Sequence, residues 1–229
     1  MHLSVRFRAM GALAAAACCS ATCAATLDFD DLGSSTLGIH MPDEYGGLGW
    51  SLSDWHYLTL AAAPTETFLA LGGSVGYISG LGGREFFLDG ADFWSRRAAD
   101  AAGDFYFILY NNGVVVYDGR NDGNDGRMRF TDVHQLLVPN YTGPIDGFAF
   151  AFDGGGDDWD HLAMDNLQVR FVCPADMDGS GTVDLGDLNQ VLFNFGETVT
   201  PGTAGDADGS GVVDLSDLNL VLFAFGEVC

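Results

Sequence analysis

The sequence has no lysine and few basic side chains of any kind. Its 229 residues contain nine bases, all of them arginine, against 32 acidic residues, which gives a formal net charge of −23. No arginine or histidine follows Cys173. Because like charges repel, this balance argues against nucleic acid or an anionic membrane surface as a partner. It favours a metal ion, a cationic partner or a neutral ligand.

Motifs of several enzyme classes are also missing. The sequence contains no His-Glu-x-x-His motif and no phosphate-binding loop. Its histidines lack the spacing of metal ligands: His40, His56, His134 and His161. A glycosidase needs two carboxylates that face each other about 5 to 9.5 Å apart. A chain so rich in acids offers such pairs by chance, and the available glutamates include Glu44, Glu66 and Glu85.

Long apolar runs are confined to the N-terminus. The run from Ala9 to Cys19 follows Arg6 and Arg8 and precedes small residues that extend to Ala25. This is the layout of a secretory signal peptide, and the run is too short to span a bilayer. We expect cleavage after Ala24 or Ala25. The mature protein should then be secreted, with an extracellular or cell-surface location and no membrane insertion.

Few cysteines remain once the signal peptide is removed. Lipidation of Cys18 or Cys23 is the alternative to cleavage, but neither residue has a leucine three positions before it. Cleavage leaves Cys173 and Cys229, an even pair in an oxidising compartment, which predicts one disulfide. Closing a loop of this length contributes roughly 4 kcal/mol in the chain-entropy model. The expected organisation is a signal peptide (1–25), a larger domain (26–172) and a small domain (173–229).

Two nearly identical acidic loops lie between these cysteines, DMDGSGTVDLGD at 176–187 and DADGSGVVDLSD at 206–217. Oxygen-bearing side chains recur at loop positions one, three, five, nine and twelve, and position seven would contribute its backbone carbonyl. Glycine occupies position six, where the sharp turn needs a residue without Cβ. The spacing therefore predicts two calcium ions, whereas a solvated acidic linker would need neither the glycines nor the repeat. The predicted ligands are Asp176, Asp178, Ser180, Thr182, Asp184 and Asp187, then Asp206, Asp208, Ser210, Val212, Asp214 and Asp217.

Helical periodicity follows each loop, and no helix is expected before either one. Apolar residues recur at i, i+3, i+4 and i+7 up to the terminating Gly196 and Gly226. We expect these two stripes to be buried: Leu188, Val191, Leu192 and Phe195, then Leu218, Val221, Leu222 and Phe225. Three apolar residues fall away from the stripes, where they would be exposed and contact a protein partner: Phe193, Leu220 and Phe223. Packing on the neighbouring domain is the alternative for these three.

A calcium loop followed by a single helix, present twice and with aspartate at position twelve, resembles the dockerin domain of cellulosome-type assemblies. The resemblance covers residues 173–229. It implies a pair of calcium sites and two roughly antiparallel helices related by pseudo-twofold symmetry. It also implies binding to a cohesin-like or other extracellular anchoring protein.

Two features depart from cellulosomal dockerins. Loop positions ten and eleven, commonly a Ser-Thr pair that touches cohesin, are here Leu185 with Gly186, and Leu215 with Ser216. The basic pair usually found later in the helix is replaced by Leu192 with Phe193, and by Leu222 with Phe223. The resemblance therefore implies calcium binding but not a cohesin of the cellulosomal kind.

From Thr26 to Phe171 the sequence pattern is that of β-strands. FYFILY and VVVYDG flank the turn residues NNG and predict a hairpin. GFAFAFDG and NLQVRF show the two-residue alternation of side chains that is typical of a strand. A short helix near residues 92–102 is the main exception. Short strands with Gly-rich turns favour an antiparallel, jelly-roll-like β-sandwich. The predicted fold class is thus mainly β, followed by a small α-helical dockerin or EF-hand-like domain.

Three fragments of the larger domain resemble a group of secreted bacterial β-sandwich domains that often end in a surface-sorting tail: FDDL at 29–32, PDEYGGLGW at 42–50 and DNLQV at 165–169. Sandwiches of this kind often bind carbohydrate, an analogy from fold. Trp159, in the polar loop DGGGDDWDH, is the best candidate to stack on a sugar ring. Other aromatic candidates are more often core: Trp50, Trp55, Tyr57 and Trp94. Further calcium ligands, or merely solvated acids, are Asp153, Asp157, Asp158 and Asp160, and the group Asp28, Asp30 and Asp165.

We therefore predict a secreted, non-catalytic protein with a β-sandwich that binds carbohydrate. A calcium-dependent dockerin-like domain would attach it to a cell surface or an extracellular complex. The alternatives are a polysaccharide-degrading enzyme, either a glycoside hydrolase or a lyase, and a structural surface-matrix protein.

Overall fold

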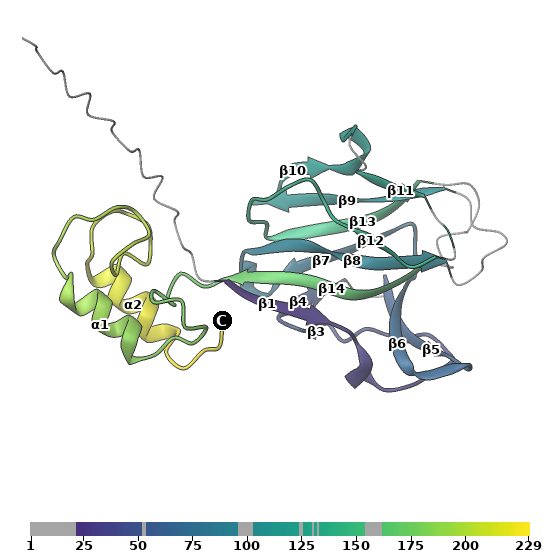
Figure 1. The fold of residues 1–229 in the computed structure, drawn as a ribbon, viewed down its shortest axis with the longest axis horizontal. Helices are drawn as coiled ribbons and strands as arrows, with labels where there is room; N and C mark the ends of the chain where they lie inside the picture. Colours follow the sequence, from purple (N-terminus) through teal and green to yellow (C-terminus); the bar gives the residue numbers. More distant parts are fainter. Residues whose placement is uncertain are drawn as a thin grey trace, which may run out of the picture. The chain divides into compact units, whose positions relative to one another are not determined.

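The computed structural model describes residues 22–51, 54–95, 103–123, 126–129, 131, 133–153 and 162–229. The described chain separates into two compact units, residues 22–173 with Glu227–Cys229, and Pro174–Gly226. The larger unit is built from strands and the smaller one holds two α-helices (Figure 1). No helix in this part of the chain is long and apolar enough to cross a membrane.

The larger unit is a sandwich of two antiparallel sheets, which confirms the predicted fold class. The first sheet contains β1 (Thr22–Leu27), β2 (Ile39–His40), β5 (Trp55–Leu60), β6 (Ala63–Leu71), β8 (Phe86–Ser95), β12 (Gln135–Leu137) and β14 (Leu162–Val172). Its order is β12-β8-β14-β6-β5-β2, and β1 also pairs with β14. The second sheet contains β3 (Glu44–Tyr45), β4 (Leu48–Trp50), β7 (Val75–Gly80), β9 (Asp104–Asn111), β10 (Val114–Asp118), β11 (Arg127–Arg129) and β13 (Gly147–Asp153). Its order is β10-β9-β13-β7-β4-β3, and β11 also pairs with β9.

The predicted hairpin is confirmed in strands β9 and β10. Asn111 pairs with Val114 across a two-residue turn. The turn residues, Asn112 and Gly113, have φ angles of 51° and 73°. Positive φ at both central positions gives the turn that matches the right-handed twist of paired strands, which explains the choice of asparagine and glycine here.

Phenylalanine side chains fill the space between the two sheets. Phe93 of β8 lies parallel to Phe150 of β13, with ring centroids 4.3 Å apart. Phe105 of β9 contacts both rings, at 5.2 Å from each centroid. On β14, Leu167 and Val169 are buried on the core side, as the alternating pattern predicts. Burial of each such side chain contributes about 1.5–3 kcal/mol, so these strands hold the sandwich together.

Two predictions from the sequence concern the larger unit, a short helix and a signal-peptide cleavage site. The predicted short helix near residues 92–102 is wrong for 92–95, which complete strand β8, and its remaining residues lie outside the described chain. Strand β1 begins at Thr22, and Leu27 pairs with Leu167. Cleavage after Ala25 stays a prediction, and it would leave Thr26 and Leu27 as the paired end of β1.

The predicted disulfide is confirmed. Cys173 and Cys229 are bonded, with their Cα atoms 5.7 Å apart, and both are buried. This separation is ordinary for a disulfide. The bond closes a loop that contains the whole of the smaller unit, so it restricts that segment in the unfolded chain.

The smaller unit contains α1 (Leu185–Phe193) and α2 (Leu215–Phe223). Each helix begins with a capping box: Asp184 accepts a hydrogen bond from Gly186 N, and Asp187 accepts one from Asp184 N. The second helix repeats this arrangement at Asp214. A pair of reciprocal bonds relates the two halves, because Gly226 N donates to Val183 O and Gly196 N donates to Val213 O, each at 2.8 Å.

The predicted buried stripes are wrong for four of their eight residues. Val191 and Val221 are buried, but the exposed residues include Leu192, Phe195, Leu222 and Phe225. The reason is the aspartate at loop position twelve. Asp187 faces its own loop and is completely buried, and the residue that shares this face four positions later is Val191. This rotation turns Leu192 toward solvent.

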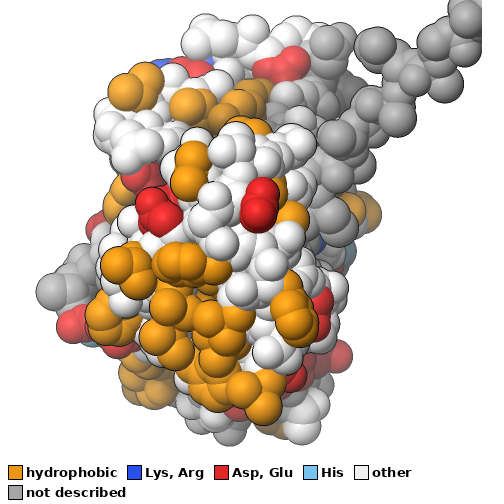
Figure 2. All heavy atoms as spheres, turned by 90° about the vertical axis from the view of Figure 1, so that its left-hand side faces the viewer, with side chains coloured by type: hydrophobic (Ala, Val, Ile, Leu, Met, Phe, Trp, Pro, Cys, Tyr) orange, Lys and Arg blue, Asp and Glu red, His pale blue; other side chains and the backbone are white. Residues whose placement is uncertain are grey.

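Large apolar side chains therefore gather on the outside of the two helices. Phe193 and Phe223 are 86% and 87% exposed, and Leu220 is 40% exposed, in agreement with their expected exposure. Figure 2 shows hydrophobic side chains collected over this face. We call this set the apolar helix surface: Leu185, Leu192, Phe193, Leu215, Leu220, Leu222 and Phe223.

Candidate functional site

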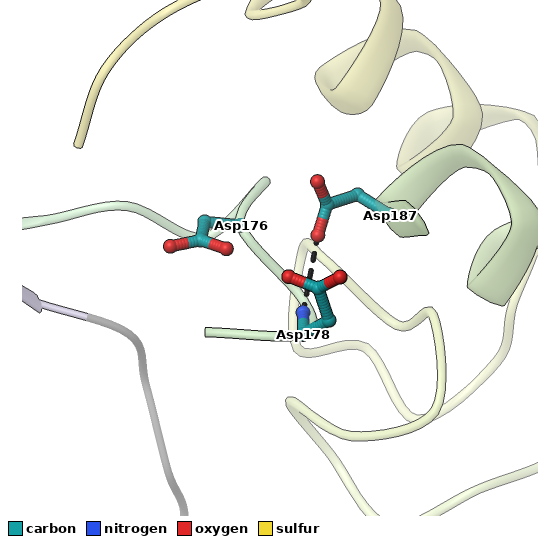
Figure 3. Close-up of side chains that lie close together, drawn as sticks. All are labelled: Asp176, Asp178 and Asp187. Atoms are coloured by element: carbon teal, nitrogen blue, oxygen red, sulfur yellow. Dashed lines mark hydrogen bonds between the residues drawn. The ribbon is translucent and has the colours of Figure 1, made fainter. Parts of the chain in front are cut away.

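Each acidic loop brings three carboxylates together. In the first loop these belong to Asp176, Asp178 and Asp187, and one oxygen from each lies within 4.8 Å of the others (Figure 3). In the second loop the equivalent residues form the same arrangement: Asp206, Asp208 and Asp217. The first and last members of each triad are buried and the middle one is exposed.

Backbone N–H groups fix the buried carboxylates of the first loop. Asp187 Oδ1 accepts hydrogen bonds from Met177 N and Asp178 N, at 2.6 and 3.1 Å. Asp176 accepts bonds from Ser180 N and Gly181 N, at 3.0 and 2.8 Å. The chain thus wraps around the triad. Gly181 reaches this position with a φ of 84°, the left-handed conformation that favours glycine.

In the second loop, backbone N–H groups also donate hydrogen bonds to the two buried carboxylates. Asp217 Oδ1 accepts a hydrogen bond from Asp208 N at 2.9 Å, and Asp206 Oδ2 accepts one from Gly211 N at 2.8 Å. A hydrogen bond from Ser210 N also lowers the pKa of Asp208. Gly211 has the same φ of 84° as its counterpart. The second loop therefore repeats the geometry of the first.

The triads have the dimensions and chemistry of a calcium site. Calcium binds oxygen ligands at 2.3–2.6 Å, so two oxygens on one ion lie no more than about 5 Å apart. At the observed separation, two ionised carboxylates repel by about 3 kcal/mol at an effective dielectric constant of 20. The sequence offers no basic side chain after Cys173 to offset this repulsion. The residues present therefore fit a divalent cation.

The remaining predicted ligands lie beside the triads and are not members of them. Ser180 Oγ donates to Thr182 O at 3.0 Å, and Ser210 Oγ donates to Val212 O at 3.2 Å, which places positions five and seven together in each loop. Position nine behaves differently, because Asp184 and its counterpart Asp214 cap the helices. Their predicted role as metal ligands stays a prediction.

A second acidic cluster surrounds Asp165 of β14 and includes Asp30 of η1 (Asp30–Leu32). Burial raises the pKa of Asp165 to about 7, and the carboxylates of Asp30, Asp28 and Asp92 act in the same direction. Asp92 is the cross-strand neighbour of Asp165, and Asp30 accepts a hydrogen bond from Thr67 N at 2.8 Å. Among the residues that the structure describes, these carboxylates do not converge as a metal site, so the calcium role considered for Asp28, Asp30 and Asp165 finds no support.

A small cavity of about 70 Å³ opens beside Asp165. Glu66 and Trp94 also line it. His134 lies parallel to the Trp94 ring, with the ring centroids 3.8 Å apart. Ligand pockets usually hold about 300–1,000 Å³, so this cavity is too small for a sugar.

A larger polar depression of about 450 Å³ lies at the end of β10. Tyr117 Oη donates to Asp122 Oδ2 at 2.9 Å, and Asn140 Nδ2 donates to the same oxygen at 2.7 Å. Burial, followed by this hydrogen bond to Asp122, raises the pKa of Tyr117 to about 12. Asp118 and Asn121 complete the polar lining. Carboxylate, amide and phenol groups held in this way can exchange hydrogen bonds with vicinal hydroxyls.

The aromatic candidates lie mainly in the core. Trp50, Trp55 and Trp94 are buried, and Tyr57 packs against the core cluster. Trp159 lies outside the described residues, together with Asp157, Asp158 and Asp160. Asp153 forms an ion pair with Arg127 at 2.9 Å. The tryptophans in the described part of the chain are therefore core residues, and the cavity that Trp94 lines is too small for a sugar.

Two local features were not identified from the sequence. His40 and His56 are cross-strand neighbours in β2 and β5, with ring centroids 4.3 Å apart, and burial lowers the pKa of His56. The stretch GGSVG at 72–76 has the Gly-x-Ser-x-Gly spacing of a nucleophile elbow. It connects β6 of one sheet to β7 of the other, and no helix follows it, so it does not form that elbow.

No protein-family model matches this sequence, and no curated protein matches it either. Solved structures that resemble it include a family 29 carbohydrate-binding module from Piromyces equi, with a TM-score of 0.36 and 9% identity over 66% of this chain and 91% of that chain. Another is the C-terminal family 6 module of a marine laminarinase from Zobellia galactanivorans, with a TM-score of 0.29 and 14% identity over 60% of this chain and 99% of that chain. Similarities this low carry no argument about function. The fold assignment depends on the strand pairing itself.

Proposed function

We propose that residues 174–226 form a calcium-dependent docking module that attaches a non-catalytic β-sandwich to an extracellular partner. The observation that carries this proposal is the pair of equivalent carboxylate triads, each with two buried members and no basic side chain in the same unit. Each triad would bind one ion through its three aspartates. Bound calcium would supply the positive charge that no basic side chain of this unit provides. Secretion, expected from the N-terminal sequence, would place the protein where calcium is abundant.

Calcium binding and folding of the small unit should be a single event. The unit has little apolar burial of its own, since Val183, Val191, Val213 and Val221 are its fully buried aliphatic residues. A small unit with so limited a core needs a metal or a disulfide to be stable. Because the unfolded loops do not present a preformed site, the free energy of metal binding stabilises the fold. The helices, and the surface they carry, would therefore depend on calcium.

The apolar helix surface is the proposed docking surface. Phe193 and Phe223 occupy equivalent positions at the ends of α1 and α2, and both are almost fully exposed. Exposed apolar patches of this kind usually mark protein contacts. The unit carries only negative charge, so the partner should present an apolar centre with a basic rim. A cohesin-like or other extracellular anchoring protein is the proposed class of partner.

For the sandwich we propose carbohydrate binding without catalysis. The specific support is the polar depression around Asp122, which combines an aromatic phenol with carboxylate and amide groups. Sugars are recognised by such combinations because each hydroxyl both donates and accepts hydrogen bonds. The enzyme alternative would need a carboxylate pair in a roomy cleft, and the pair formed by Glu66 and Asp165 lines a cavity of only about 70 Å³.

The docking proposal can be tested with the full chain immobilised on beads. Extracellular and cell-surface fractions of the source organism are applied with calcium or with chelator. Calcium-dependent capture of one protein should be lost in Phe193→Ser/Phe223→Ser. Leu37→Ser is the control, since Leu37 is another strongly exposed apolar residue and belongs to the sandwich. Undiminished capture by the double Phe variant, with its helices intact by circular dichroism, would end the docking proposal.

The carbohydrate proposal needs a separate measurement. A glycan array probed with the full chain, followed by a reducing-sugar assay on each ligand, distinguishes three functions. Binding without turnover supports the proposed function, and turnover supports a glycoside hydrolase or lyase. If neither binding nor turnover is found, the remaining function is that of a structural surface-matrix protein.

A further inference from the structure

Two histidines lie next to each other at the edge of the first sheet. β2 is an edge strand of this sheet and pairs with β5, so that His40 lies opposite His56. Met41 N donates a hydrogen bond to Trp55 O at 3.0 Å, which makes the next pair along the strands a hydrogen-bonded one. The two kinds of pair alternate in an antiparallel ladder. His40 and His56 therefore form a non-hydrogen-bonded pair, the kind in which the side chains are closer together.

Both imidazoles lie on the outer face of the sheet. Trp55 belongs to the core, and side chains alternate along a strand, so His56 points away from the core. The same holds for His40, whose neighbour Met41 is a core residue. His40 is exposed and His56 is half-buried. An ion can therefore reach the pair from solvent without a rearrangement of the sandwich.

The distance between the two rings suits a single metal ion. An imidazole nitrogen binds zinc at about 2.0–2.1 Å, which places the ring centroid about 3.2 Å from the ion. Two imidazoles on one ion, at an angle of about 90–109°, then have centroids about 4.5–5.2 Å apart. The observed centroid separation is 4.3 Å, and the ring planes are inclined by 40°. A small rotation of the exposed His40 ring is enough to reach the required separation.

The ring nitrogens are available as ligands. Within the described part of the chain, neither imidazole forms a hydrogen bond or an ion pair. Burial lowers the pKa of His56, and the nearby His40 acts in the same direction. At neutral pH, His56 is therefore in its neutral form, in which one ring nitrogen has a free lone pair.

We propose that His40 and His56 chelate one divalent transition-metal ion, of which Cu²⁺ and Zn²⁺ fit best. Imidazole is a preferred ligand of these ions, whereas calcium prefers oxygen, so the site is distinct from the two acidic loops. No third His, Cys, Asp or Glu of the described residues joins the pair in a cluster. Water, or a group of a bound molecule, would therefore fill the other coordination positions. The net charge of −23 raises the local concentration of cations around the chain.

The ion would hold the edge of the first sheet in place. β2 has only two residues, and β5 is its partner in the sheet. An ion bound to both strands stabilises the arrangement in which they are paired, because it binds the folded edge and not the open one. Open sheet edges are sites at which other chains can pair. A firmly held β2 would therefore cover the edge of β5.

The test uses the full chain in saturating calcium, so that the acidic loops are already supplied with their ion. Isothermal titration with Zn²⁺, and separately with Cu²⁺, should detect one further ion per chain. His40→Gln and His56→Gln should each weaken this binding by about 100-fold, because a single imidazole lacks the chelate effect. His134→Gln is the matched control and should change nothing, since His134 is also exposed but stacks on Trp94.

Thermal unfolding, followed by tryptophan fluorescence, gives a second readout. Zn²⁺ at about 100 times its dissociation constant should raise the unfolding midpoint of the unsubstituted sandwich by about 5 °C or more, and should not raise that of either pair variant. Equal binding of Zn²⁺ and Cu²⁺ by the unsubstituted chain and both pair variants would overturn the assignment. Loss of binding in His134→Gln alone, or no further ion beyond calcium, would also overturn it.

Discussion

Replacing Asp165 with asparagine should stabilise the sandwich at neutral and alkaline pH. Asp165 lies opposite Asp92 across β14 and β8, and burial raises its pKa from an ordinary value of 3.8 to about 7. The folded protein therefore prefers the protonated acid. The contribution of Asp165 to stability is complete below about pH 4 and is lost as pH rises through 7, where a charge must be held among three other carboxylates.

The size of the effect follows from this difference in pKa. A separation of 3.8 to about 7 corresponds to an upper bound of about 4 kcal/mol. Asp165 is only partly buried, so solvent screening reduces this to about 1–2 kcal/mol. Asparagine removes the charge and retains the oxygen that accepts a hydrogen bond from Asn166 N. The variant should gain this free energy at pH 8 and gain almost nothing at pH 4.

Tryptophan fluorescence measures this effect selectively, because all four tryptophans belong to the larger domain. Thermal unfolding of Asp165→Asn should shift upward at pH 8 by a few degrees, since 1 kcal/mol corresponds to about 2–4 °C in a domain of this size. Asp43→Asn changes the same charge at an exposed position and is the control. A shift of equal size at pH 4 and pH 8, or none at pH 8, would refute the reasoning.

Three other substitutions have defined outcomes. Phe150→Ala removes the ring stacked on Phe93 and should lower the stability of the sandwich by about 3–5 kcal/mol in urea unfolding; a loss below 1 kcal/mol would contradict the core packing described. Gly181→Ala should weaken calcium binding at the first loop and cost about 1–2 kcal/mol, since its φ is 84°, whereas Gly123→Ala should change neither. Cys229→Ser should allow chelator to abolish the helical circular dichroism at lower concentration, and an unchanged chelator titration would argue against a stabilising disulfide.

Features set by local sequence were predictable. The hairpin of β9 and β10 depends on the turn residues between them, and the carboxylate triads depend on spacing within twelve residues. The disulfide was predicted from the count of cysteines together with the expectation that the protein is secreted. The hairpin and the triads depend on residues that are close together in the sequence. For the disulfide, removal of the signal peptide leaves only two cysteines, so only one pairing is possible.

Features set by tertiary contacts were not predictable. The buried face of α1 was misplaced because Asp187, a polar residue, takes the inner position that an apolar residue takes in most helices. The raised pKa of Asp165 depends on the strand register that puts Asp92 opposite it.

The central claim is that two calcium ions fold the acidic C-terminal unit. Isothermal titration of the full chain, stripped of metal and then supplied with calcium, tests it most directly. The account predicts two ions per chain, one ion in either Asp187→Asn or Asp217→Asn, and helical circular dichroism that rises in step with the heat. The absence of heat at millimolar calcium, or the same stoichiometry when both aspartates are replaced, would contradict it.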